Sequence, residues 1–215
     1  MADYSNISVN AQSSIRIAGS KIIYFDPFHV DKETHDADVI FVTHEHYDHF
    51  EPDSIKKLLK AETILVAPES MKAKVLKKSG VLEKNCVFYV PNESYELDGL
   101  KIETVPAYNK LKPFHPKWNK WLGYIVELDG TRYYVAGDTD VNADILKVKC
   151  DVALIPIGGH YTMDKKQAAE YILELKPTAV IPTHYGTLIG SPEDGADLKK
   201  MVEEKDSSIE VVLKL

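Results

Sequence analysis

Four side chains of the kinds that bind metal ions fall within six residues, directly after an apolar run at 39–42. They are His44, His46, Asp48 and His49. Residues two apart point the same way only from an extended or looped chain, so His44 and His46 can share one ion if a strand ends there. Asp48 and His49 are adjacent, and a turn must swing both toward a common centre, which could be a second metal. A histidine-rich surface turn is the plainer alternative, but imidazole and carboxylate are ordinary zinc ligands and this pattern has no other obvious use.

The elements beside this motif must hold it at the end of a strand. A helix over 54–60 is expected directly after it, with Asp53 or Ser54 as its N-cap. Residues 38–44 and 178–184 repeat one pattern, an apolar strand that ends in Thr-His. A pseudo-duplicated pair of sheets fits this internal echo.

The remaining elements follow from the alternation of apolar and polar residues and from turn signals. Strands are expected at 7–9, 14–18, 21–25, 63–67, 86–90, 100–105, 122–128, 131–136, 151–156, 179–181 and 209–214. Helices are expected over 69–79, over 164–176 with Thr162 as N-cap, and near 193–204. Periodicity alone predicts mixed layers of helix and sheet, an α/β (α+β) chain forming a single domain over residues 1–215.

Composition narrows the class of protein. The 215 residues carry a formal net charge of -7, which disfavours a general nucleic-acid binder. The first residues lack the basic and apolar regions of a signal peptide, and no apolar run approaches membrane-spanning length. Cys86 and Cys150 lie beside apolar runs without ligand-like spacing, so buried, reduced thiols are expected. We expect a cytoplasmic protein that does not act on a membrane, and a homo-oligomer is left open.

The run His-x-His-x-Asp-His after a hydrophobic strand resembles the signature of the metallo-β-lactamase superfamily of metal-dependent hydrolases. The likeness extends from Ile7 to His184, and it is greatest to the small, single-domain branch related to ascorbate-6-phosphate lactonase. The resemblance implies a four-layer αββα sandwich, two sheets with helices outside, in which both Thr-His ends meet at one rim. It is a poor guide to substrate, because one scaffold hosts many reactions.

The same resemblance implies further members of a metal centre. Asp138, in Ala-Gly-Asp-Thr, matches a segment whose aspartate bridges two metals, although alone it resembles a turn residue. His184, in Thr-His-Tyr-Gly, matches the last histidine ligand. Asp26, which ends strand 21–25, matches a carboxylate beside the metal loop that could orient a ligand histidine.

One ligand position departs from the family pattern. Related proteins carry a histidine just after the strand that corresponds to 104–107, where this chain has Tyr108 and Asn109. The nearest histidine is His115. We favour His115 as the ligand, because imidazole binds divalent transition metals better than a neutral amide does. Asn109 as a weak oxygen ligand, or a site that is one ligand short, remain as alternatives.

Two features are candidates for substrate contact. His160 follows a strand and precedes a helix N-terminus near glycines, a position that can receive an anion. The loop 110–121 interleaves lysines, Lys117 among them, with Trp118 and Trp121, and could clamp a phosphorylated or ring-shaped substrate. The alternatives are a histidine packed in a loop and an ordinary solvated loop.

Together these residues predict a metal-dependent hydrolase with two divalent ions, of which zinc is favoured while manganese or iron is left open. The expected ligands are His44, His46 and His115 for one ion, and Asp48, His49 and His184 for the other, with Asp138 between them. A metal-activated hydroxide would attack a small, anionic lactone or ester, and Asp48 could accept a proton if only one ion is bound. The alternatives are a phosphodiesterase or nuclease on the same centre, and a non-catalytic metal-binding regulatory module.

Overall fold

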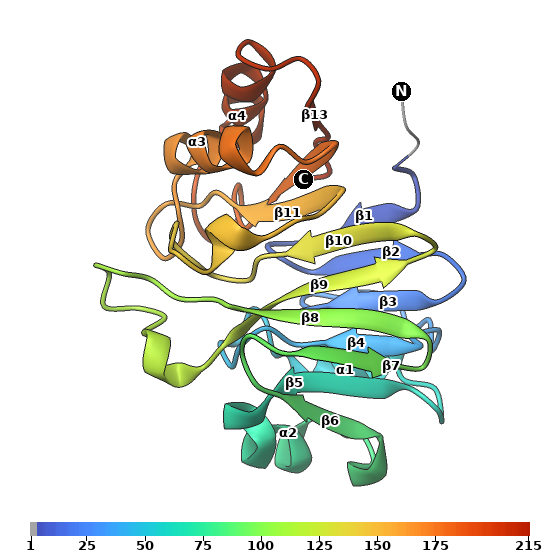
Figure 1. Cartoon of the computed structure of the whole chain (residues 1–215). Coiled ribbons are helices and arrows are strands. Elements are labelled where there is room, and N and C mark those ends of the chain that lie inside the picture. Colours follow the sequence, from blue (N-terminus) through green and yellow to red (C-terminus); the bar gives the residue numbers. More distant parts are fainter. Residues whose placement is uncertain (1–3) are drawn as a thin grey trace.

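The computed structural model describes residues 4–215 and contains two β-sheets (Figure 1). The first sheet has six strands in the order β1-β2-β3-β4-β5-β6. Their bounds are β1 Ile7–Val9, β2 Ile15–Ala18, β3 Ile22–Phe25, β4 Val39–Phe41, β5 Ile64–Pro68 and β6 Cys86–Tyr89. β1, β2 and β3 pair antiparallel, whereas β3 to β6 run parallel.

The second sheet has seven strands in the order β13-β12-β11-β10-β9-β8-β7. Their bounds are β7 Ser94–Leu97, β8 Leu100–Pro106, β9 Leu122–Leu128, β10 Thr131–Val135, β11 Val152–Pro156, β12 Ala179–Thr183 and β13 Glu210–Val211. β10 to β13 run parallel, and β7 to β10 pair antiparallel. β7 was not among the predicted strands; its exposed, mixed sequence lies at the edge of the sheet and buries little.

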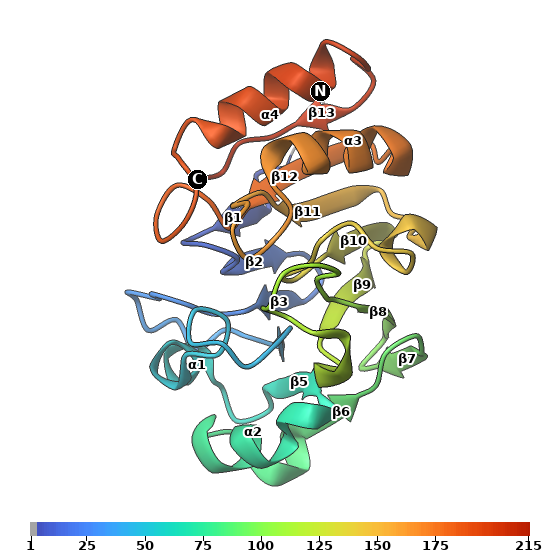
Figure 2. The ribbon, with the colours of Figure 1, turned by 90° about the vertical axis from the view of Figure 1, so that its left-hand side faces the viewer.

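Three apolar clusters define four layers. One cluster lies between the two sheets and joins inward residues such as Phe25 and Phe41 to Tyr124 and Leu154. A second covers the outer face of β10 to β12 with helices α3 Lys165–Leu175 and α4 Asp194–Glu203. The third covers the outer face of β3 to β5 with α1 Pro52–Leu58 and α2 Lys72–Lys78. The helices lie outside the packed sheets, so the predicted αββα sandwich is confirmed (Figures 1 and 2).

The predicted N-caps of two helices are wrong. α1 begins at Pro52 after Glu51, because proline's fixed φ suits the first turn, where its missing N–H costs nothing. The Ser54 hydroxyl instead accepts from the backbone N–H of Val30 at 2.9 Å. α3 is capped by Asp164 rather than Thr162, through a capping box in which the Asp164 carboxylate accepts from two backbone N–H groups and Gln167 reciprocates.

Smaller structural details complete the fold. Short 3-10 turns lie at Glu69–Met71, Glu83–Asn85, Lys117–Asn119 and Ile145–Lys147. Cys86 and Cys150 are free thiols, each partly rather than fully buried. Over residues 4–215, no helix combines the length and apolarity that a membrane crossing requires.

The strand directions bring the chemically important segments to one rim. β4, β8, β10 and β12 are followed by the segments that carry His44, His115, Asp138 and His184. β8 and β10 are both antiparallel to β9, and β12 is parallel to β10 through β11, so three of these strands end on the same side of their sheet. Figure 2 faces this rim, with loops of both sheets toward the viewer.

Candidate metal centre

Three histidines form the first group of possible metal ligands. His44 and His46 follow β4, and the Nε2 atom of His44 lies 3.1 Å from Nδ1 of His46. His115 contributes its Nε2 atom 3.2 Å from the same Nδ1. The segment after β4 is irregular rather than helical, which is what allows residues two apart to face one point.

The second group contains a carboxylate. Asp48 Oδ2 lies 3.6 Å from Nε2 of His49 and 3.3 Å from Nε2 of His184. The rings of His49 and His184 stack at 5.2 Å between centroids, although the two residues come from opposite sheets. The two strand ends that share the Thr-His pattern therefore do meet at the rim.

Asp138 lies between the two groups. Its Oδ2 atom is 3.3 Å from Nε2 of His115 and 3.3 Å from Nε2 of His184. Its Oδ1 atom is 3.3 Å from Nε2 of His49. Asp138 follows Gly137, whose φ of +63° suits glycine, and a Cβ there would lie only 3.1 Å from the Cβ of Thr43. One carboxylate thus faces donors of both groups.

The donor atoms fit metal ions in spacing and in hydrogen bonding. A tetrahedral zinc with bonds of about 2.0–2.1 Å to nitrogen separates neighbouring ligand atoms by roughly 3.3 Å, close to the separations found here. Within residues 4–215, the buried atoms that lack a hydrogen-bond partner include His49 Nε2, Asp138 Oδ1 and His184 Nε2. Buried polar groups are ordinarily paired, so these orphaned atoms are explained if cations bind there.

A buried carboxylate supports the motif from behind. Asp26 Oδ2 lies 2.7 Å from Nδ1 of His49, and Oδ1 accepts from the backbone N–H of Thr43 at 2.7 Å. The Thr43 hydroxyl donates to Asp26 at 2.6 Å and lies 3.0 Å from Nδ1 of His44. Holding Nδ1 in this way orients each ring and turns Nε2 toward the cluster. Asp26 occupies the position of the predicted orienting carboxylate.

The loop after β8 returns His115 to the cluster. The backbone N–H of Ala107 donates to Trp121 O at 3.0 Å, and that of Asn109 donates to His115 O at 2.8 Å, so the loop closes on itself twice. The Asn109 amide nitrogen donates to Tyr161 O at 2.6 Å and lies 3.4 Å from Nδ1 of His115. The Nδ1 atom of His115 is on the side of the ring away from the cluster, so Asn109 lies behind the His115 ring.

The pKa values of two residues of the cluster are both lowered, for different reasons. Burial, assisted by the neighbouring His49, lowers the pKa of His44 well below its ordinary value. Its imidazole is therefore neutral and keeps the lone pair that a metal needs. Burial acts to raise the pKa of Asp138, but the imidazoles of His184 and His49 outweigh it and hold that pKa well below the usual range.

A cavity of about 350 Å³ opens over the cluster. Its polar lining consists of His46, Asp48, His115, Asp138 and His184. Its apolar lining consists of Tyr47, Phe114, Tyr161, Leu188 and Ile189. Sequence reasoning identified the polar side but not the apolar one, since isolated apolar residues in loops carry no periodic signal.

His160 and Lys117, the two predicted substrate contacts, do not line this cavity. The ammonium group of Lys117 lies 3.0 Å from Asp144 Oδ2 and 3.3 Å from Tyr108 Oη. The His160 ring packs against Tyr161 at 4.5 Å between centroids, and Tyr161 forms the cavity wall. Of the two tryptophans in the 110–121 loop, Trp118 is exposed, whereas Trp121 is buried against the cluster, 4.9 Å from the His44 ring.

Comparison with known proteins agrees with this geometry. A family model described as a β-lactamase superfamily domain matches residues 9–184. A UPF0173 metal-dependent hydrolase of Thermococcus onnurineus is 34% identical over 205 residues, covering 90% of each chain. A crystal structure from Parabacteroides distasonis, assigned as a metal-dependent hydrolase, has a TM-score of 0.79 and 30% identity over 97% of this chain and 92% of its own. A metallo hydrolase of Ignicoccus hospitalis has a TM-score of 0.78 and 26% identity over 96% of this chain and 93% of its own.

The chain belongs to the β-lactamase superfamily. Within it, the chain groups with the metal-dependent hydrolases that share a third of its residues over nearly their full length.

Proposed function

We propose that this protein is a hydrolase that cleaves lactones or esters at a centre of two divalent ions. The observation that carries the proposal is the position of Asp138, whose carboxylate lies within 3.3 Å of nitrogen donors from both groups. When bound, such ions lower the pKa of a water molecule and polarise the carbonyl under attack. Water adds across the acyl C–O bond, giving a carboxylic acid and an alcohol.

Seven side chains are the proposed metal ligands. The proposed ligands of the first ion are His44, His46 and His115; those of the second are Asp48, His49 and His184. Five imidazoles and two carboxylates suit zinc, and manganese or iron are the rival ions. Asp48 is the more exposed of the carboxylates, its side chain 12% exposed against 3% for Asp138, and it could accept a proton near the reacting atoms if only one ion is bound.

The cavity disfavours a nucleic-acid or phosphodiester substrate. None of the residues that line it is lysine or arginine, and the net charge of -7 adds no attraction for a polyanion. A purely structural metal site is closed by protein ligands, whereas this cluster opens into a cavity of small-molecule size. A hydrolytic site for a small molecule accounts for both features.

Metal content measured alongside hydrolysis tests the proposal. Purified wild-type protein should carry close to two divalent ions per chain and hydrolyse members of a panel of lactones, esters, thioesters and phosphodiesters. His115→Ala should lose about one of these ions, while Asn109→Ala should keep both, since imidazole is the stronger ligand. Hydrolysis that persists after complete removal of metal would refute the proposal. Loss of metal from Asn109→Ala but not from His115→Ala would exchange the roles of these residues and favour a harder ion.

A further inference from the structure

The cavity over the candidate metal centre has one apolar wall. Phe114 is 38%, Leu188 50% and Tyr47 67% exposed, although large apolar side chains gain by burial. Tyr161 stands edge-on to Phe114 at 4.6 Å between ring centroids, which holds the Phe114 ring in place. Exposed apolar groups gathered beside a polar floor are the mark of a binding site for an apolar ligand group.

The loop lysines do not supply the positive charge that an anionic substrate group would need. Lys112 is paired with Asp140 at 2.5 Å and also donates to Thr162 O. These contacts anchor the loop, and Lys112 does not line the cavity. Lys117 is paired with Asp144. Apart from histidines, the ionisable groups that do line the cavity are Asp48, Asp138 and two tyrosines. A carboxylate or phosphate on the far end of a substrate would find no cation there.

We propose that the part of the substrate remote from the scissile bond is uncharged and apolar, an aryl or branched alkyl group seated against Phe114, Leu188 and Ile189. This inference rests on the proposed hydrolase function and replaces the anionic substrate expected from the loop lysines. The cavity of about 350 Å³ holds roughly a dozen non-hydrogen atoms at the ~30 Å³ that liquid water occupies per molecule. A fused aryl lactone has this size.

Steady-state kinetics of the metal-loaded protein test the charge and the shape of this group. The substrates are dihydrocoumarin, a carboxylate-bearing dihydrocoumarin and γ-butyrolactone. We expect kcat/KM for dihydrocoumarin to exceed that of the carboxylate analogue by about tenfold or more. The carboxylate group would be desolvated in the cavity without gaining a cation as partner. Leu188→Lys should narrow or reverse this ratio. Preference of the wild-type protein for the carboxylate analogue would overturn the inference.

Matched substitutions test the wall itself. Phe114→Ala should lower kcat/KM for dihydrocoumarin about tenfold relative to γ-butyrolactone, which is too small to reach the wall. Leu111→Ala, on the same loop but 96% exposed and outside the cavity lining, should leave this ratio unchanged. Equal effects of the two substitutions would remove Phe114 from the binding site.

A binding measurement without metal separates this inference from the hydrolase proposal. Calorimetric titration of metal-free protein with 2-naphthol should show binding that Phe114→Ala weakens about fivefold and Leu111→Ala does not change. Such binding with no hydrolysis of any substrate would refute the hydrolase proposal alone. Metal-dependent hydrolysis together with undetectable naphthol binding would refute the apolar wall alone.

Discussion

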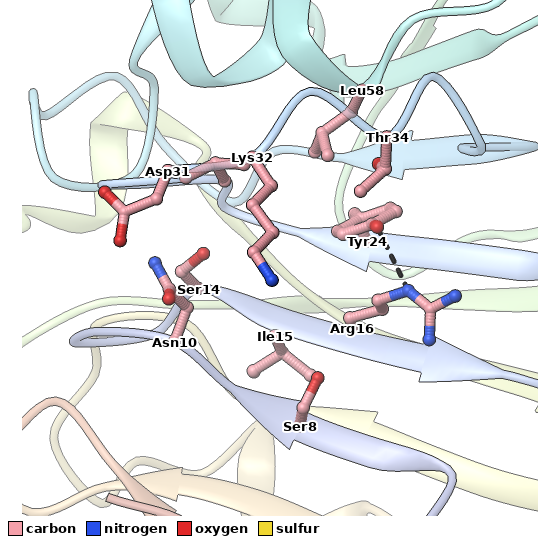
Figure 3. A pocket seen from close by; sticks show the side chains of 11 residues that line it. Ser8, Asn10, Ser14, Ile15, Arg16, Tyr24, Asp31, Lys32, Thr34 and Leu58 are labelled. Carbon is pink, nitrogen blue, oxygen red and sulfur yellow. Dashed lines mark hydrogen bonds between the residues drawn. The ribbon is translucent and has the colours of Figure 1, made fainter.

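Two cavities of similar size contrast in how their polar groups are paired. The one over the candidate metal centre is lined by Asp138 and His184, which carry buried oxygen and nitrogen atoms without hydrogen-bond partners. The other, of about 270 Å³, lies over the outer face of β1 to β3, where Figure 3 shows the Lys32 side chain reaching into the space between Ser14 and Arg16. None of the residues lining that second cavity has a buried polar atom without a partner.

Three groups that line the second cavity are paired with Asp36, which lies beside it. Arg16 donates to Tyr24 Oη at 3.0 Å and pairs with Asp36 at 3.0 Å. Tyr24 and Thr34 both donate to the same Asp36 carboxylate, at 2.9 and 2.6 Å. Most buried polar groups of a folded chain are paired, and a missing ligand is one explanation of the exceptions. Unpaired buried nitrogen and oxygen atoms, rather than volume or polarity, therefore distinguish the cavity over the candidate metal centre from the second cavity.

The largest expected difference between the cavities comes from removing a proposed ligand. His46→Ala should lower hydrolysis by about a thousandfold or more, because several kcal/mol of transition-state stabilisation would be lost. Its free energy of unfolding without metal should change by less than about 1 kcal/mol, since the side chain is half-buried and outside the apolar cores. Arg16→Ala is the matched change in the second cavity and should leave kcat/KM unaltered. Steady-state rates measure hydrolysis, and urea unfolding measures the free energy of unfolding. A His46→Ala variant that keeps its activity would contradict the proposed difference between the two cavities.

A smaller effect is expected from the carboxylate behind the cluster. Asp26→Asn should weaken metal affinity about 10- to 100-fold, because the neutral amide holds Nδ1 of His49 less firmly. Competition with a chromogenic chelator measures this affinity. Asp36→Asn, which alters a paired carboxylate beside the second cavity, serves as the control and should leave affinity unchanged. Equal affinities in all three proteins would show that Asp26 has a packing role only.

A still smaller effect is expected at Lys117. Lys117→Ala should change kcat and KM by less than about twofold, because its ammonium is paired with Asp144 outside the cavity and exposed pairs contribute little. Lys110→Ala, on the same loop, provides the comparison. A KM raised severalfold at constant kcat, in Lys117→Ala alone, would mean that the loop closes over substrate and that this lysine contacts it.

The smallest effect concerns the pH dependence of stability at the second cavity. Burial acts to raise the pKa of Asp36, but hydrogen bonds from Thr34, Arg16 and Tyr24 outweigh it and lower that pKa below 3.8. A depressed pKa stabilises the fold above the unfolded value and loses this contribution as pH falls through the folded value. Chemical unfolding between pH 6 and about pH 3 should therefore show a loss of under about 1 kcal/mol that Asp36→Asn lacks. An identical pH profile in both proteins would count against this pairing.

The amino-acid sequence by itself determined the type and local arrangement of the proposed ligands. Spacing in the motif at 44–49 requires an irregular strand end, and the structure has one. The apolar periodicities of β4, β10 and β12 predicted the strands that precede His44, Asp138 and His184. Local signals failed at the helix N-caps, which are Glu51 and Asp164 rather than the neighbouring polar residues. One of those neighbours, Ser54, accepts a hydrogen bond from the distant Val30 instead.

Only the tertiary structure decided which residues complete and surround the centre. His115 reaches the cluster because Asn109 and His115 pair through their backbones and because Lys112 is held by Asp140, 28 residues further along the chain. The apolar wall joins loops around Phe114, Tyr161 and Leu188, whose proximity depends on the order of β8, β11 and β12 in the second sheet. Contacts between residues so far apart leave no periodic trace in the sequence, because they are set by how whole layers pack.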